Sequence, residues 1–139
     1  MIVLDTNVIS EVSKLEPDPN VADWLRRADA LELYLCAPVV AELSFGGHVL
    51  KLRSGSDRYL TALDALLSGG YGERFLGFDR AAALQFGRIR AERAGIGRPI
   101  PVVDAMIAAI CLAHGATLAT RNVRDFDLPG LTLINPFEN

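Results

Sequence analysis

The sequence predicts an α/β fold of three layers, with helices on both faces of a mainly parallel central sheet of four to five strands. Short apolar runs of strand length alternate with longer segments of helical periodicity. Glycine, proline and aspartate separate these segments where turns and helix caps are expected. With 139 residues, 50% of them hydrophobic, the chain is expected to form one domain over 1–139.

The first strand is expected at residues 2–4, where three apolar residues lead into the polar sequence Asp5-Thr6-Asn7. A short helix is expected near residues 8–13. Pro17-Asp18-Pro19 then breaks the chain and provides Asp18 as a helix cap, with Pro19 at the first helical position. A helix of about a dozen residues should follow, and its expected inner face carries Val21, Trp24, Leu25 and Ala28.

The second strand is expected at residues 33–36, after which Pro38 opens a helix. Its expected core positions are Val39, Val40, Leu43 and Val49. A polar cluster at 53–57 indicates a loop and a helix cap, and the next helix is expected at about 58–67. Gly69-Gly70 should end it.

A third strand is expected at residues 75–78, and Asp79 should cap a helix that runs to Gly95. Ala82, Phe86, Ile89 and Ala94 should face inward, with the arginines outward. The turn-rich segment 95–101 leads into a helix at 102–114, which is apolar nearly all round and so is expected to be buried. Residues 116–120 and 131–134 read as the fourth and fifth strands.

Several classes of protein are disfavoured by composition. Asp104 interrupts the longest apolar run, so no membrane span is expected, and no signal peptide is visible, which favours a cytoplasmic protein. Cys36 and Cys111 have no neighbouring cysteine and read as buried hydrophobic residues. His48 and His114 are isolated, so the sequence carries no zinc motif.

The net charge of -3 disfavours a nonspecific nucleic-acid binder, but the charge is unevenly distributed. Residues 80–124 carry seven arginines and two acids, whereas residues 1–32 carry seven acids and three basic residues. Two interpretations stay open. The arginines form solvated helix faces, or they form a basic wall that holds a phosphate backbone opposite an acidic site.

Four acids from four separate segments could converge at one edge of the sheet: Asp5, Glu42, Asp104 and Asp125. Asp5 follows the first strand, and ligands bind beyond the carboxyl ends of parallel strands. Asp104 lies in an apolar helix, where an ionised carboxylate needs a positive or hydrogen-bonding partner. Its alternative role is that of a helix N-terminal cap.

Such a cluster requires protons or cations, because two carboxylates about 4 Å apart repel by about 4 kcal/mol at an effective dielectric constant near 20. Oxygen ligands without cysteine or histidine select hard ions, which here means Mg²⁺ or Mn²⁺. An ion of this kind suits phosphodiester cleavage.

Four segments resemble the ordered motifs of PIN-domain proteins, especially VapC-type toxins of bacterial toxin–antitoxin pairs and the related FitB-type proteins. The matching segments are Leu4-Asp5-Thr6-Asn7, Ala41-Glu42-Leu43, 103–109 and 120–126. The resemblance covers essentially the whole chain, and four motifs in order are a specific signal.

This resemblance implies a magnesium-dependent endoribonuclease that acts on structured RNA, a homodimer, and an antitoxin that blocks the acidic pocket. It implies that Asp5 and Asp104 are the leading metal ligands and Glu42 the third acid. The fourth position is open between Asn122 and Asp125, and Asp125 is favoured as ligand or water-orienting group. Thr6 and Thr120 either position water or a carboxylate, or cap strand ends.

Two rival functions remain. Phosphoaspartate hydrolases also open with a strand that ends in aspartate, but they need a second aspartate where this chain has Asn7. Lys14 and Lys51, the only lysines, do not follow a later strand. The other rival is a noncatalytic binding module whose acidic pocket grips an arginine of a VapB-like antitoxin, so that DNA is bound only through that partner.

Overall fold

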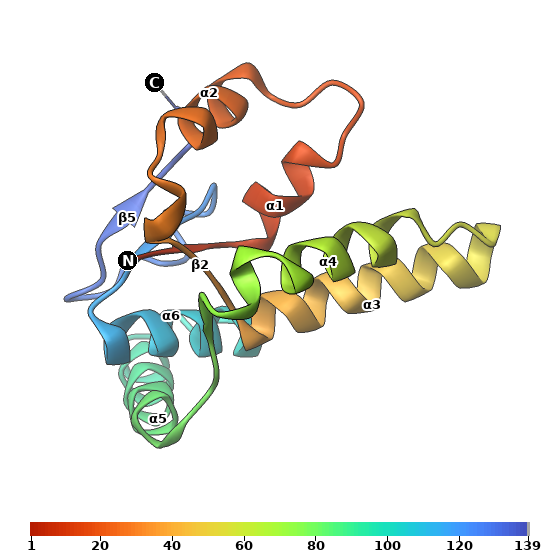
Figure 1. Cartoon of the computed structure of the whole chain (residues 1–139). Coiled ribbons are helices and arrows are strands. Elements are labelled where there is room, and N and C mark those ends of the chain that lie inside the picture. The colour runs from red at the N-terminus through yellow and green to blue at the C-terminus, as the bar shows by residue number, and fades with distance from the viewer. Residues whose placement is uncertain (139) are drawn as a thin grey trace.

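The computed structural model describes residues 1–138 and contains a five-stranded sheet in the order β3-β2-β1-β4-β5 (Figure 1). All neighbouring strands are parallel. The strands are β1 (Ile2–Leu4), β2 (Leu33–Cys36), β3 (Phe75–Leu76), β4 (Thr117–Ala119) and β5 (Leu133–Ile134). The predicted parallel α/β sheet is therefore confirmed.

Alternate residues of the strands point into two separate cores. In β1, Val3 belongs to one cluster of buried side chains and Leu4 to the other. The neighbouring β4 follows the same alternation, because Leu118 pairs in register with Val3, and Ala119 pairs with Leu4. This period of two explains why apolar runs without polar alternation form strands that are buried on both faces.

Helices cover both faces of the sheet. Those that pack on the Leu4 face are α1 (Thr6–Val12), α2 (Pro19–Arg27) and α4 (Arg58–Ser68), whereas α5 (Arg80–Gly95) and α6 (Val102–His114) pack on the Val3 face. The long helix α3 (Ala37–Ser54) contributes Val39 to one core and Val40 to the other. Beyond the sheet, α3 and α4 run side by side as a projecting pair (Figure 1). Two short 3₁₀ helices lie at Ala30–Glu32 and Gly70–Gly72.

Helix caps agree with the residues that predicted them. Asp18 caps α2 by accepting a hydrogen bond from the Asn20 N–H, and Pro19 takes the first helical position. Asp79 caps α5 through the Ala82 N–H at 2.9 Å. Gly115 ends α6 with a φ of 63°, a left-handed conformation that glycine adopts without steric cost.

Some predicted boundaries and faces were wrong. The helix after β1 begins at Thr6 and not near Val8, because Asp5 caps it directly, and α2 has nine residues where about a dozen were expected. The strand β3 stops at Leu76, and Phe78 packs edge-on against Phe86, with ring centroids 5.6 Å apart. Val49 lies outside both core clusters.

The inner face of α5 also differs from the prediction. Ala94 is exposed, whereas Arg93, expected to point outward, is only 6% exposed. The main-chain carbonyls of other segments bind its guanidinium, so this face accommodates a cation in place of an apolar side chain. Across residues 1–138, no helix is both long and apolar enough to cross a membrane.

Candidate acidic site

The acidic site lies where the order of strands in the sheet reverses, between β1 and β4. The chain leaves β1 toward β2 on one side and later returns to β4 on the other side of β1, which makes the carboxyl ends of β1 and β4 a topological switch point. Asp5 directly follows β1, and Thr120 directly follows β4. Sheet topology therefore brings these two residues together.

Asp5 is 4% exposed and is held by three hydrogen-bond donors. The Thr6 N–H donates to Oδ1 at 2.8 Å, and Thr120 Oγ1 and Asn7 Nδ2 donate to Oδ2 at 2.7 and 3.2 Å. Burial raises the pKa of the Asp5 carboxyl. The three hydrogen-bond donors lower this pKa, whereas the nearby charge of Glu42 raises it further. Burial outweighs the donors, so the folded protein holds a proton on Asp5 more tightly than an exposed aspartate would.

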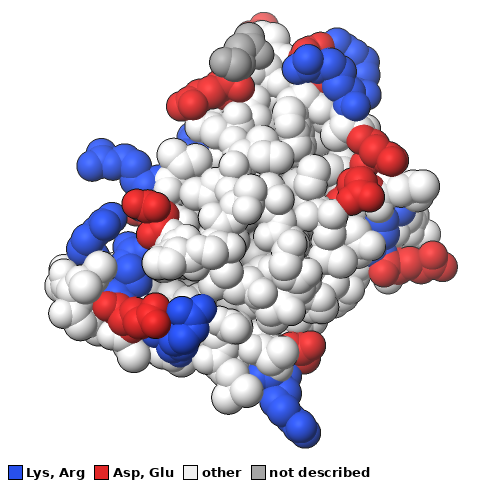
Figure 2. All heavy atoms as spheres, turned by 90° about the vertical axis from the view of Figure 1, so that its left-hand side faces the viewer, with Lys and Arg blue, Asp and Glu red and all other residues white. Residues whose placement is uncertain are grey.

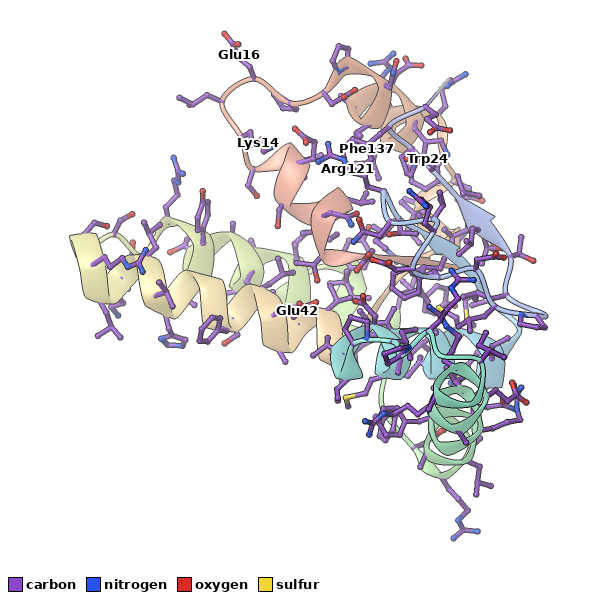
Figure 3. All side chains as sticks on the ribbon, turned by 180° about the vertical axis from the view of Figure 1, so that it is seen from behind. Lys14, Glu16, Trp24, Glu42, Arg121 and Phe137 are labelled. Atoms are coloured by element: carbon purple, nitrogen blue, oxygen red, sulfur yellow. The ribbon has the colours of Figure 1, made fainter. Side chains whose placement is uncertain are left out.

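Thr6 joins Asp5 to the second predicted acid. Its N–H donates to Asp5, while its hydroxyl donates to Glu42 Oε1 at 2.7 Å. Glu42 is exposed and lies in the second turn of α3, close to the carboxyl end of β2 (Figure 3). One threonine at the start of α1 therefore links carboxylates that are 37 positions apart in the sequence.

Asp104 lies in the first turn of α6 and is half-buried. The cap position of α6 is Pro101, and no side chain caps this helix, so Asp104 is not the N-terminal cap of the alternative interpretation. Burial raises the pKa of Asp104 to about 6, with further contributions from the charges of Asp5, Glu42 and Asp125, in that order. The carboxyl of Asp104 is therefore within electrostatic reach of all three other predicted acids.

Asp125 and Asn122 lie in the turn that follows β4. Both residues are exposed, and the Asp125 N–H donates to the Asn122 carbonyl at 3.1 Å. The Asn122 N–H donates to Thr120 Oγ1 at 3.0 Å, so this turn is fastened to the hydroxyl that binds Asp5. The charge of Asp125 contributes to the raised pKa of Asp104, less than the charges of Asp5 and Glu42 do.

The donor chemistry fits a hard cation. Over the described part of the chain, no three carboxylate, histidine or cysteine side chains are close enough to form a complete metal site. Mg²⁺ does not require such a site, because it keeps several waters and binds proteins through one or two carboxylates. The buried thiols of Cys36 and Cys111 have raised pKa values, which disfavours the thiolates that zinc selects.

A fifth acid, Glu11, was missed by sequence reasoning. The side chain of Glu11 in α1 is 5% exposed and binds Lys14 Nζ at 3.1 Å, the Asp18 N–H at 3.2 Å and Arg121 Nη2 at 3.4 Å. The hydrogen bond from Lys14 is the largest cause that lowers the pKa of Glu11. Its position three residues after the buried Val8 was a signal, because this spacing puts both side chains on the inner face of the helix.

Arg121 connects that ion pair to the rest of the site. Its guanidinium carbon lies 3.8 Å from the centre of the Phe137 ring, and Figure 3 shows the two side chains together near Lys14. The Arg121 N–H donates to Asn7 Oδ1 at 3.2 Å, while the amide group of Asn7 donates to Asp5. Asn7 is therefore a link between the loop after β4 and the buried carboxylate.

The predicted basic segment is not a uniform wall. Arg93 is buried, Arg88 forms an ion pair with Glu92 at 3.1 Å, and Arg121 pairs with Glu11. The face drawn in Figure 2 carries blue and red side chains interspersed around a largely uncharged centre. Arg98 and Arg124 are exposed on the segments that flank Asp104 and Asp125, so basic side chains do lie next to the acids in the chain.

An apolar groove opens beside the acids. It has a volume of about 690 Å³ and runs between α1, α3, α4 and the start of α6. Its lining residues include Thr6, Glu42, Phe45, Tyr59, Leu63 and Met106. Because Thr6 and Glu42 belong both to the groove and to the acidic site, a molecule bound in the groove could reach the carboxylates.

Comparison with known proteins gives consistent matches. The family model described as PIN domain matches residues 2–129. The chain is 40% identical over 139 residues to plasmid stability protein StbB of Pseudomonas syringae pv. tomato and 38% identical over 138 residues to VapC ribonuclease Y4jK of Sinorhizobium fredii, with 99% of each chain covered in both cases. A solved structure of FitAB bound to an IR36 DNA fragment superposes with a TM-score of 0.87 at 31% identity, covering 100% of this chain and 97% of that one.

Proposed function

The chain belongs to the PIN-domain family, and from this premise we propose that it is a Mg²⁺- or Mn²⁺-dependent endoribonuclease toxin that cleaves structured RNA and is neutralised by a cognate antitoxin. One observation carries the proposal. Thr6 donates to both Asp5 and Glu42 at the switch point of a parallel sheet, so acids from separate elements are held at the position where such sheets bind ligands.

Asp5 and Asp104 would be the leading metal ligands, and Glu42 and Asp125 would complete the set through bound water. A bound Mg²⁺ would polarise a phosphate oxygen, lower the pKa of a water and neutralise charge on the leaving oxygen. The three donors to Asp5 fix its carboxylate in one orientation. A carboxylate has about four acceptor sites, so Asp5 retains room for one more partner.

Asp104 must be ionised to bind a cation, and a cation nearby would lower its raised pKa. Asp125 is exposed to solvent, which suits orientation of the attacking water. Asn122 would remain a neutral neighbour of this group. Arg98 and Arg124 are exposed on the adjacent segments and would hold RNA phosphates that the acids alone would repel.

We assign the apolar groove to the antitoxin. A VapB-like segment with apolar side chains would bury Phe45 and Tyr59, and an arginine on that segment would enter the acidic pocket past Glu42. The FitAB structure bound to DNA supports a partner that brings DNA to the complex, since this chain carries a net charge of -3. The toxin is expected to be a homodimer.

The alternative is a noncatalytic PIN-fold module that acts only with a DNA-binding partner. The DNA-bound FitAB structure motivates this alternative, because binding of a complex to DNA does not by itself involve cleavage of RNA. In that case the acids would serve only to bind the partner's arginine. The two functions differ in whether the carboxylates perform metal-dependent chemistry.

Cleavage of RNA by the purified full chain separates them. Total cellular RNA would be incubated with the wild type, Asp5→Asn and Asp64→Asn, in Mg²⁺, in Mn²⁺ and in chelator. Asp64 is an exposed aspartate of α4 and provides the matched control. The proposal requires metal-dependent cleavage that Asp5→Asn abolishes and Asp64→Asn retains. Equal cleavage by all three proteins, or none, would favour the binding module.

A further inference from the structure

Arg93 is a buried cation with no acid as its partner. Its side chain lies on the inner face of α5 and is 6% exposed, and among residues 1–138 it forms no ion pair. Removing a guanidinium from water is costly unless its N–H groups find acceptors. Helix packing alone would place an apolar side chain here, so the contacts of Arg93 explain its presence.

Two main-chain carbonyls from different segments bind the guanidinium. Arg93 Nε donates to the Arg98 carbonyl at 2.7 Å, and Nη1 donates to the Asp125 carbonyl at 3.1 Å. The Arg98 N–H also donates to the Arg93 carbonyl at 2.9 Å. The turn after α5 is thus fixed to Arg93 through both main chain and side chain.

Each of these segments carries one of the acids. The segment that begins at Arg98 passes through Pro99 and Pro101 and becomes α6, in whose first turn Asp104 lies. The two prolines stiffen this connection, because each has a fixed φ. The other carbonyl belongs to Asp125 itself. One planar side chain therefore connects the backbone six residues before Asp104 with the backbone at Asp125.

We propose that Arg93 is a positioning residue of the acidic site, whose guanidinium sets the placement of Asp125 relative to Asp104. This inference rests on the proposed metal-dependent nuclease. An arginine is required because its rigid fork can donate to two carbonyls at once, whereas a lysine ammonium on a flexible stem cannot match that geometry. Groups that orient metal ligands usually change metal affinity about 10- to 100-fold when they are removed.

The test measures Mn²⁺ affinity by electron paramagnetic resonance for the full chain with Arg93→Met, Arg93→Lys or Arg90→Met. Arg90 is an exposed arginine on the same helix and serves as the control. Arg93→Met should weaken Mn²⁺ binding by about tenfold or more, and Arg93→Lys by a smaller factor. Arg90→Met should remain within about twofold of the wild type.

A double-mutant cycle with Asp125→Asn separates positioning from a general loss of stability. If Arg93 acts through Asp125, then Arg93→Lys will weaken Mn²⁺ binding less in the Asp125→Asn background than in the wild type. Equal effects in both backgrounds would overturn the inference, as would wild-type affinity in Arg93→Lys. If Arg93→Met does not fold, the comparison of Arg93→Lys with the wild type is sufficient for the test. A wild type that neither binds Mn²⁺ nor cleaves RNA would instead contradict the proposed function itself.

Discussion

The Thr120 hydroxyl donates a hydrogen bond of 2.7 Å to the Asp5 carboxylate, across 115 positions of sequence. Both side chains are buried, and the same hydroxyl accepts the Asn122 N–H. The carboxyl ends of two neighbouring strands are therefore joined by one side chain. Neither residue is a surface group, so loss of this bond should affect both the fold and the acidic site.

We expect Thr120→Val to destabilise the protein by about 1–3 kcal/mol, because a valine has nearly the same shape but removes the shortest of the three hydrogen bonds to the buried Asp5 carboxylate. Thr120→Ser keeps the hydroxyl and is the control. Chemical denaturation at neutral pH without metal measures the difference. Equal stability of the valine and serine variants would show that the Asp5 carboxylate does not depend on this bond.

The raised pKa of Asp104 leads us to expect that the stability of the metal-free protein depends on pH. Its carboxyl has a pKa of about 6 when folded and an ordinary value of 3.8, so the folded state binds the proton more tightly. Stability should therefore fall as pH rises from about 4 to about 6, and the loss should persist above that range. Asp104→Asn should reduce this fall, which denaturation curves at several pH values would reveal. An unchanged profile would contradict the assignment.

The lowered pKa of Glu11 leads us to expect the opposite dependence of stability on pH. Lys14, the Asp18 N–H and Arg121 lower the pKa of Glu11 below its ordinary value of 4.5. The stabilisation is thus complete above that value and is lost as pH falls through the lower folded pKa. Glu11→Gln should be less stable than the wild type at pH 7, and the difference should shrink in acid. A gap that does not change with pH would mean that the charge of Glu11 is unimportant.

Two adjacent glycines of α3 provide a matched pair for the packing of α3 on α4. A Cβ at Gly46 would meet nothing within 4 Å, whereas a Cβ at Gly47 would lie 2.7 Å from Leu60 Cδ2 and 3.0 Å from its Cγ. Gly46→Ala should stabilise the protein by about 0.5–1 kcal/mol through helix propensity. Gly47→Ala should lose that gain, because Leu60 must move. Thermal unfolding of both variants would detect the difference, and equal shifts would contradict the close approach.

The sequence by itself determined the kind of fold and the strand or helix end at which each predicted acid lies. The segments predicted at 2–4, 33–36 and 116–120 contain parallel strands, the last of them at 117–119, since residues buried on both faces need no polar alternation. Asp18, Asp79 and Gly115 marked helix ends, because capping depends only on neighbouring backbone groups. The Asp-Thr-Asn sequence after the first strand marked the start of the next helix, because Asp5 caps it.

Only the tertiary structure decided which side chains meet. The hydrogen bonds from Thr120 to Asp5 and from Thr6 to Glu42 follow from strand order, which local sequence does not encode. Arg93 was predicted to face outward, but it is buried, and its hydrogen-bond acceptors are main-chain carbonyls of two later segments. Helical periodicity indicates which face of a helix is buried, but it does not indicate which groups of other segments contact that face. A buried charge is stable only when its partners are placed in three dimensions.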